Sequence, residues 1–267
     1  MLKLFSDYPP GSMTFRLKRF SYRVFDEQGS PKLLNFLSYQ NKLEELVHIG
    51  TEASLYSSPL SEITSAEPGM LLPELKCLTG QVETVRRLVP GRPVSKIIFN
   101  EHVPPAIMES IVSAISRATV PLVYLSILGT PSRTRNGSGI LTWISRLSPF
   151  HESLETLIFQ ITLPVERRRI SRPSVTQRST HDWLIRSLST VTLLDQSDAF
   201  TDDLELFKSA LSHFVAIQTL IIKSKPRIFY SQIRRPWAPE LDQFSWWAEV
   251  CPSLRFVSFF GNELSET

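Results

Sequence analysis

Leu122-Val-Tyr-Leu-Ser-Ile127 and Leu154-Glu-Thr-Leu-Ile-Phe159 follow one pattern: an apolar residue, two variable residues, an apolar residue, one variable residue and a third apolar residue. The last two apolar positions lie two residues apart, which is the periodicity of a β-strand. The first apolar position lies three residues earlier, where a turn can lead into the strand. Each stretch therefore predicts a short buried strand that follows a turn.

The same pattern recurs along the whole chain, at an average spacing of roughly 30 residues. Its matches begin at Leu17, Leu43, Leu75, Val94, Leu122, Leu154, Leu188, Ile217 and Leu254, of which the one at Leu75 is a half-match that ends at Gly80. A single match carries no weight in a chain rich in Leu, Ile and Val, but a series at similar spacing indicates repeats. We therefore predict one repeat domain over residues 1–267, with strands near 17–22, 43–48, 75–79, 94–99, 122–128, 154–161, 188–194, 217–222 and 254–260.

The segments between the matches test this prediction, because they should hold amphipathic helices. Apolar residues at helical spacing follow Pro104, Gly139 and Asp203, and a last stripe runs from Leu241 to Val250. Strands that alternate with helices favour a parallel sheet. The predicted fold is α/β, an irregular leucine-rich-repeat-like solenoid with a parallel sheet on one side and helices on the other. In the predicted order, a short turn leads from helix to strand and a long loop leaves the strand.

Four stretches resemble a known family. Residues 72–80 and the run Leu88-Val-Pro-Gly-Arg-Pro-Val94 are similar to the leucine-rich-repeat-like region of F-box proteins from mushroom-forming fungi, and residues 33–46 and 251–257 are similar to it as well. The most distinctive of these is Val-Pro-Gly-Arg-Pro-Val. The resemblance implies a curved repeat domain that displays a protein-binding surface. In complete members an N-terminal F-box docks the chain to a cullin-based ubiquitin ligase, but here the first repeat match already begins at Leu17, so ligase adaptor binding is not supported.

The long loops suggest where a partner would bind. Residues 163–180 carry a net charge of +4 and residues 223–239 carry +5, whereas residues 195–203 between them carry −4. This contrast could steer an acidic protein partner. The candidate partner-binding residues are Arg167, Arg168, Arg169, Arg172, Lys225, Arg227, Arg234, Arg235 and Trp237. Two simpler interpretations stay open: charged loops keep an edge soluble, and Trp237 packs with Trp246 and Trp247 in a C-terminal core.

Composition and motifs exclude several classes of function. The net charge of +3 is too small to imply nucleic acid by itself, no stretch is long and apolar enough to span a membrane, and the two cysteines form no paired motif. The five histidines are scattered, and no nucleophile elbow or phosphate loop is present. We therefore expect no enzymatic activity, cofactor or metal, and an intracellular location in the cytoplasm or nucleus.

Two competing hypotheses remain at this stage. The first is a nucleic-acid-associated protein that uses the two basic loops, which predicts binding that weakens steeply with salt. The second is a truncated gene product without stable function. The favoured hypothesis is a protein–protein interaction module, as the substrate-recognition part of an F-box-type ubiquitin-ligase receptor that lacks its F-box.

Overall fold

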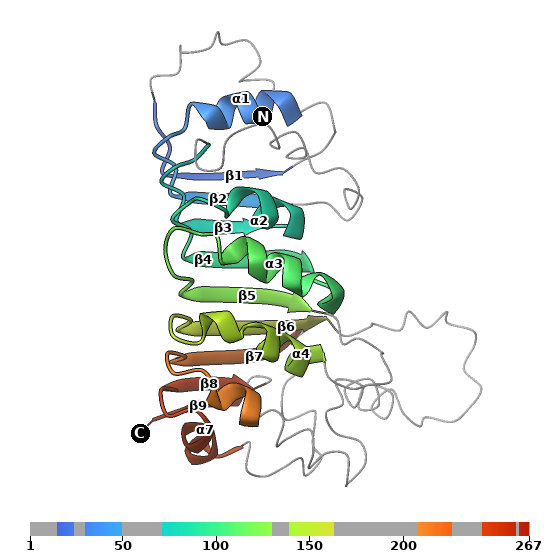
Figure 1. Cartoon of the computed structure of the whole chain (residues 1–267), viewed down its shortest axis with the longest axis vertical. Coiled ribbons are helices and arrows are strands. Elements are labelled where there is room, and N and C mark those ends of the chain that lie inside the picture. Colours follow the sequence, from blue (N-terminus) through green and yellow to red (C-terminus); the bar gives the residue numbers. More distant parts are fainter. Residues whose placement is uncertain are drawn as a thin grey trace, which may run out of the picture. The chain divides into compact units, whose positions relative to one another are not determined.

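The computed structural model describes residues 15–23, 30–49, 71–129, 139–162, 208–225, 242–259 and 262–266. Nine strands in these ranges form one sheet, in which the strands lie in the order of the chain (Figure 1). They are β1 (Arg19–Arg23), β2 (Glu45–Ile49), β3 (Cys77–Gly80), β4 (Lys96–His102), β5 (Tyr124–Gly129), β6 (Thr156–Thr162), β7 (Thr219–Lys225), β8 (Phe256–Phe259) and β9 (Asn262–Ser265). The chain divides into two compact units, one of residues 1–127 with 153–156 and one of residues 128–152 with 157–267.

Strands overlap the predicted ranges wherever the structure describes the chain. Eight of the nine predicted ranges coincide with β1 to β8, and the range 188–194 lies outside the described residues. Strands β1 to β4 pair in parallel, and so do β7 and β8, which agrees with the predicted parallel sheet. Strand β9 departs from the prediction, because it pairs with β8 in the antiparallel direction. Only two residues separate these two strands, and so short a connection can join only antiparallel neighbours.

Successive strands begin with the same pair of hydrogen bonds. The carbonyl of Lys18 accepts the N–H groups of both Glu44 and Glu45, each at 2.9 Å, and the carbonyl of Glu44 accepts those of Lys76 and Cys77 at 2.8 and 3.0 Å. The same arrangement recurs at the carbonyls of Lys76, Ser95, Val123 and Gln218. In every case the accepting residue directly follows the first apolar residue of the sequence pattern. The pattern therefore marks equivalent steps in the structure.

The first apolar residue of the pattern ends a tight turn. The N–H of Leu43 donates to the carbonyl of Gln40 at 3.1 Å, that of Leu75 to Leu72 at 3.2 Å, and that of Leu254 to Cys251 at 3.0 Å. Each of these leucines is buried, because the turn points its side chain toward the helices. A turn side chain also accepts a hydrogen bond from the preceding match of the pattern: the Gln40 side-chain oxygen accepts the N–H of Leu17 at 2.9 Å.

Three of the predicted helices are present and a fourth is partly described. The stripe after Pro104 forms the 3₁₀ turn η5 (Pro105–Ile107) and α3 (Met108–Ile115), the stripe after Gly139 forms α4 (Gly139–Arg146), and the last stripe forms α7 (Phe244–Val250). Of the stripe after Asp203, residues 208–212 are helical. A second 3₁₀ turn, η6 (Ser148–Phe150), lies within the connection from α4 to β6.

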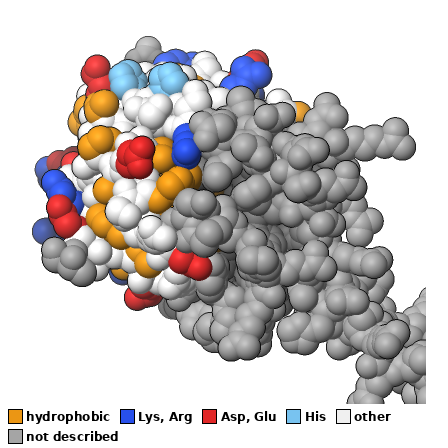
Figure 2. All heavy atoms as spheres, turned by 90° about the horizontal axis from the view of Figure 1, so that it is seen from below, with side chains coloured by type: hydrophobic (Ala, Val, Ile, Leu, Met, Phe, Trp, Pro, Cys, Tyr) orange, Lys and Arg blue, Asp and Glu red, His pale blue; other side chains and the backbone are white. Residues whose placement is uncertain are grey.

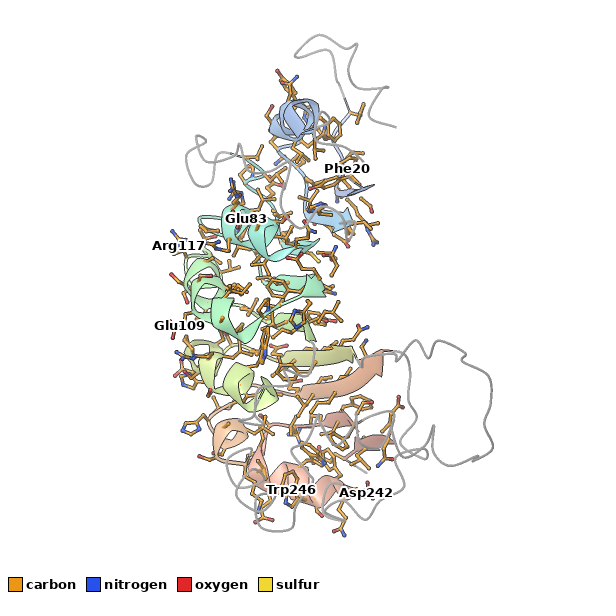
Figure 3. All side chains as sticks on the ribbon, turned by 90° about the vertical axis from the view of Figure 1, so that its right-hand side faces the viewer. Phe20, Glu83, Glu109, Arg117, Asp242 and Trp246 are labelled. Atoms are coloured by element: carbon orange, nitrogen blue, oxygen red, sulfur yellow. The ribbon has the colours of Figure 1, made fainter. Side chains whose placement is uncertain are left out.

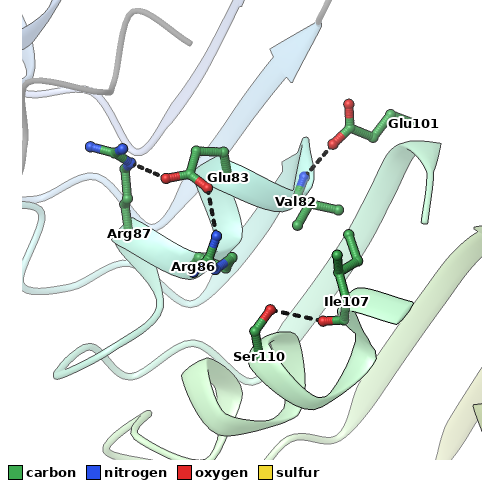
Figure 4. A network of polar contacts seen from close by, with 7 residues as sticks. All are labelled: Val82, Glu83, Arg86, Arg87, Glu101, Ile107 and Ser110. Atoms are coloured by element: carbon green, nitrogen blue, oxygen red, sulfur yellow. Dashed lines mark hydrogen bonds and ion pairs between the residues drawn. The ribbon is translucent and has the colours of Figure 1, made fainter. Parts of the chain in front are cut away.

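Two helices were not predicted: α1 (Ser30–Ser38) and α2 (Val82–Leu88). Only Gln81 separates α2 from β3, which corrects the expectation that the connections leaving the strands are long. The close approach of strand and helix is possible because Gly80 has no side chain; a Cβ there would lie 3.2 Å from Thr84. The first turn of α2 is fixed by the carboxylate of Glu101 on β4, which accepts the N–H of Val82 at 2.6 Å (Figure 4). On the exposed side of α2, Glu83 pairs with Arg86 and Arg87.

The run Val-Pro-Gly-Arg-Pro-Val at 89–94 directly follows α2, and Val89 is the C-cap of that helix. Gly91 has a φ of 74°, which a glycine adopts without strain. The side chain of Arg92 turns back into the interior, where it is 1% exposed. Its guanidinium donates to the carbonyls of Leu88 and Pro90 at 3.0 and 3.1 Å, and also to that of Leu71. This arginine therefore binds carbonyl groups that the end of a helix leaves without a partner.

The core lies between the sheet and the helices. In the N-terminal unit, α2 and α3 lie on the same face of the sheet (Figure 3). The second apolar residue of the pattern is half-buried in the first match, Phe20, and buried in the other described matches, namely Leu46, Leu78, Ile97, Leu125, Leu157, Leu220 and Val257. Strand residues one position away point to the opposite face. The described helices of the N-terminal unit leave that opposite face uncovered.

Candidate binding surface

The sheet face opposite α2 and α3 carries a row of polar and charged side chains. The parallel register places Arg19, Glu45, Cys77 and Lys96 side by side on β1 to β4, and Tyr124 follows on β5. The Arg19 Nε lies 3.3 Å from the Glu45 carboxylate, and the Lys96 Nζ lies 4.4 Å from the centre of the Tyr124 ring. Contacts of this kind hold each charged group in place along the row without removing it from solvent. We call this row and its neighbours the open strand face.

A second row on the open strand face lies two residues further along each strand. It consists of Ser21, Val47, Thr79, Ile98 and Ser126. Apart from the exposed Ser21, these side chains are half-buried, and beyond them Ile49 on β2 is 43% exposed. Small polar residues therefore alternate with branched apolar ones, next to a row of charges. A mixed surface of this kind suits contact with another protein better than it suits the binding of a small molecule.

Cys77 lies at the centre of the charged row, but its thiol is not activated. Burial, and to a smaller extent the Glu45 carboxylate, raise the pKa of Cys77, whereas the cations of Lys96 and Arg19 oppose that rise. A cysteine with a raised pKa is a weak nucleophile near neutral pH, since the thiolate is the reactive form. The surroundings of Cys77 therefore do not favour a nucleophilic role.

The opposite side of the same strands holds a buried polar cluster. The ring of Tyr22 stacks on that of His48 at 4.8 Å, and the His48 Nδ1 lies 2.9 Å from the hydroxyl of Thr84 on α2. The side-chain amide of Asn100 donates to the His48 carbonyl. Burial lowers the pKa of His48 to about 4 and raises that of Tyr22, so both are neutral at pH 7. Because the His48 side chain is 0% exposed, it cannot contact a substrate. The cluster instead joins β1, β2 and β4 to α2.

Eight of the nine predicted partner-binding residues lie outside the described residues. The ninth, Lys225, is the last residue of β7. The predicted site on the two basic loops therefore stays a prediction. The alternative for the tryptophans is confirmed in two positions: Trp246 and Trp247 are buried and meet edge to face at 4.9 Å, while Trp237 is not described.

Figure 2 shows one further face of the described residues. On the face shown there, acidic, basic and apolar side chains are intermixed. Within the described ranges, no group of three or more His, Cys, Asp or Glu residues is placed to hold a metal ion. Among the helices of the same ranges, none has the length and apolar character needed to cross a bilayer.

The open strand face was not predicted from the sequence, although its residues could have been found. They are the variable positions of the recurring pattern, which must point away from the core if the apolar positions point toward it. What the sequence alone does not provide is the register that puts Arg19 next to Glu45 and Lys96 next to Tyr124.

None of the family models, curated proteins or solved structures compared with this chain matches it significantly.

Proposed function

We propose that this chain is an irregular leucine-rich-repeat-like α/β solenoid that acts as a protein–protein interaction module. The observation that supports the proposal is the recurring step in which one carbonyl accepts two successive N–H groups of the next unit. Units that repeat the same step stack on their neighbours and share one continuous core. Such stacks use their strands and loops to bind other proteins, because the fold itself uses only the apolar side of each strand.

The open strand face is the part of the described structure best suited to that role. It combines paired charged groups, such as Arg19 and Glu45, with the aromatic ring of Tyr124 and the exposed side chain of Ile49. Charged and aromatic side chains give an interface its specificity and much of its binding energy. In the F-box proteins that the sequence resembles, a repeat domain recognises the substrate of a ubiquitin ligase. We propose the same recognition role here.

The test is capture of partners at low salt by the full chain and by two variants with the same change of charge. Lys96→Glu reverses a charge on the open strand face, whereas Arg117→Glu reverses one on the helix side (Figure 3). We expect a protein that the wild type and Arg117→Glu retain and that Lys96→Glu loses, as identified by mass spectrometry. Circular dichroism melts confirm that both variants are folded.

Two results would contradict the proposal. Identical sets of proteins on all three baits would show that the open strand face binds nothing specific. Recovery of nucleic acid in place of protein, with steep loss as salt rises, would instead support the competing hypothesis of nucleic-acid binding.

A further inference from the structure

The outer edge of β1 has backbone donors without an acceptor among the described residues. β1 is the first strand of the sheet, and the carbonyl of Lys18 accepts the N–H groups of Glu44 and Glu45 on the side of β2. The N–H groups of Lys18 and Arg19 therefore point to the other side. At the equivalent positions of β2 to β6 and of β8, both N–H groups donate to the preceding strand. At β1, the first strand of the series, the two equivalent N–H groups have no acceptor among the described residues.

The same edge is strongly basic. Residues 15–23 contain four cations, Arg16, Lys18, Arg19 and Arg23, and no acidic residue. The side chain of Arg19 is 70% exposed even though it contacts Glu45. Like charges on a strand must be offset by the strand that joins them, because side chains directly opposite each other lie within about 5 Å. The charge of β1 therefore selects against a basic neighbour and favours an acidic one.

Neighbouring strands in this unit pair charges of opposite sign. Arg19 on β1 meets Glu45 on β2, and Glu44 just before β2 meets Lys76 just before β3, with N–O distances of 3.3 and 3.4 Å. The sign thus alternates from positive to negative to positive along the first three strands. A strand added outside β1 would continue the alternation only if it were acidic.

The C-terminal unit matches a basic residue with an acidic one at the other kind of edge, where β8 offers carbonyl groups instead of N–H groups. Arg255 precedes β8 as Lys18 precedes β1, since each directly follows the first apolar residue of its pattern. Along β8, the chain adds β9 as a further strand, and the residue after β9, Glu266, pairs with Arg255. The Glu266 N–H also donates to the Arg255 carbonyl at 3.3 Å. A basic residue at this position is therefore matched by an acidic residue where a further strand joins β8, although the added segment donates the hydrogen bond there and would accept it at β1.

We propose that the outer edge of β1 binds an extended acidic segment of a partner protein, which joins the sheet as an additional strand. A backbone carbonyl of that segment accepts the N–H groups of Lys18 and Arg19, and its carboxylates lie beside the same two side chains. Backbone pairing provides the affinity and the charges provide the choice of partner. This site adjoins the open strand face at Arg19 but uses the backbone edge of β1, so it goes beyond the function proposed above.

The experiment measures binding of short labelled peptides to the full chain by fluorescence anisotropy at low salt. The probe is a peptide of alternating Glu and Val. One control replaces Glu by Lys, and a second carries N-methyl groups on alternate backbone nitrogens, which keeps the charge but prevents strand pairing. We expect only the first peptide to bind. We expect Lys18→Glu to weaken it by at least about tenfold, and Lys96→Glu, with the same change of charge on the open strand face, to leave it within about twofold.

Hydrogen–deuterium exchange provides the second measurement, because it reports on the edge itself. The peptide that covers residues 15–23 should exchange quickly in the free chain and slowly in the complex. Failure of the acidic peptide to bind overturns the proposal, as does equal binding of the N-methylated peptide or equal weakening by Lys96→Glu. Slow exchange in the free chain would also overturn it, since another part of the chain would then already occupy the edge.

Discussion

At the scale of single residues, His48 shows how burial decides the role of a titratable group. Its ring lies between Tyr22 on β1 and Thr84 on α2, and its carbonyl binds Asn100 on β4. All these contacts can be made by a neutral imidazole, whose Nδ1 either donates to or accepts from the threonine hydroxyl. The His48 Nε2 and the Tyr22 hydroxyl are buried without a hydrogen-bond partner among the described residues. Protonation would place a charge next to these groups with nothing to compensate it.

The first prediction concerns the pH dependence of stability. The pKa of His48 is about 4 in the folded chain and about 6.5 when it is unfolded. Below pH 6.5 the unfolded chain therefore binds the proton more strongly, so stability falls as the pH drops from about 6.5 to about 4. We expect His48 to account for a loss of about 2 kcal/mol in the free energy of unfolding between pH 7.5 and pH 5. Urea denaturation at the two pH values measures it.

The matched variant for this prediction is His48→Phe, which keeps a ring against Tyr22 but cannot titrate. Its stability at pH 7.5 differs from that of the wild type because Thr84 loses its partner. The informative quantity is therefore the difference between the two pH values, which should shrink by about 2 kcal/mol. An unchanged difference would show that other groups cause the acid sensitivity.

At the scale of elements, the end of α2 depends on a side chain that folds back on it. Arg92 binds the carbonyls of Leu88 and Pro90 and reaches across to Leu71, so it ties the end of the helix to the segment before β3. No carboxylate takes part in these hydrogen bonds. Burial lowers the pKa of Arg92 to about 10, which leaves the guanidinium charged at pH 7. The charge is balanced by carbonyl dipoles, which makes the hydrogen bonds stronger than those of a neutral donor.

The second prediction is that Arg92→Met destabilises the chain by about 3 kcal/mol, because several buried carbonyls lose their donor at once. Arg92→Lys should recover only part of the loss, since an ammonium group cannot reach carbonyls that lie around a planar guanidinium. Arg117→Met on the exposed end of α3 is the control, with an expected change below about 0.5 kcal/mol. Chemical denaturation measures all three variants. If Arg92→Met and Arg117→Met prove equally stable, Arg92 does not hold the end of α2.

At the scale of the whole molecule, the strands follow one another in chain order and each pairs only with its neighbours in sequence. Contacts in such an arrangement are local along the chain. Stability is then close to a sum of terms for each unit and for each interface between neighbours. A substitution that destabilises one strand and its helix should therefore destabilise the neighbouring strands and helices most.

The third prediction uses Leu78→Ala, which removes a fully buried side chain from β3. A substitution of this kind costs about 2–5 kcal/mol in a packed core. We expect hydrogen exchange to accelerate most in β2, β3, β4 and α2, and much less in β7 and β8, as measured by mass spectrometry. An equal acceleration everywhere would indicate a single cooperative core, against the repeat architecture proposed here.

The sequence by itself determined where the strands lie and on which side they are buried. Spacings such as Leu122-x-x-Leu125-x-Ile127 indicate which side chains are buried. Burial of apolar side chains is the dominant favourable contribution to folding. Helix α3 was predictable for the same reason, because its stripe of apolar residues is long enough to show the helical period. Helix α2 was not predicted, and its position depends on Glu101 and Gly80, which belong to other elements.

Tertiary structure alone decided which residues became neighbours. The resemblance drew attention to the run around Arg92, but only the fold shows that its guanidinium binds the end of a helix. Likewise, the pairs of opposite charge, Arg19 with Glu45 and Glu44 with Lys76, have no meaning until the register sets the strands side by side. Burial is encoded in each side chain separately, whereas pairing depends on which strands meet and in what register, and those are properties of the folded chain.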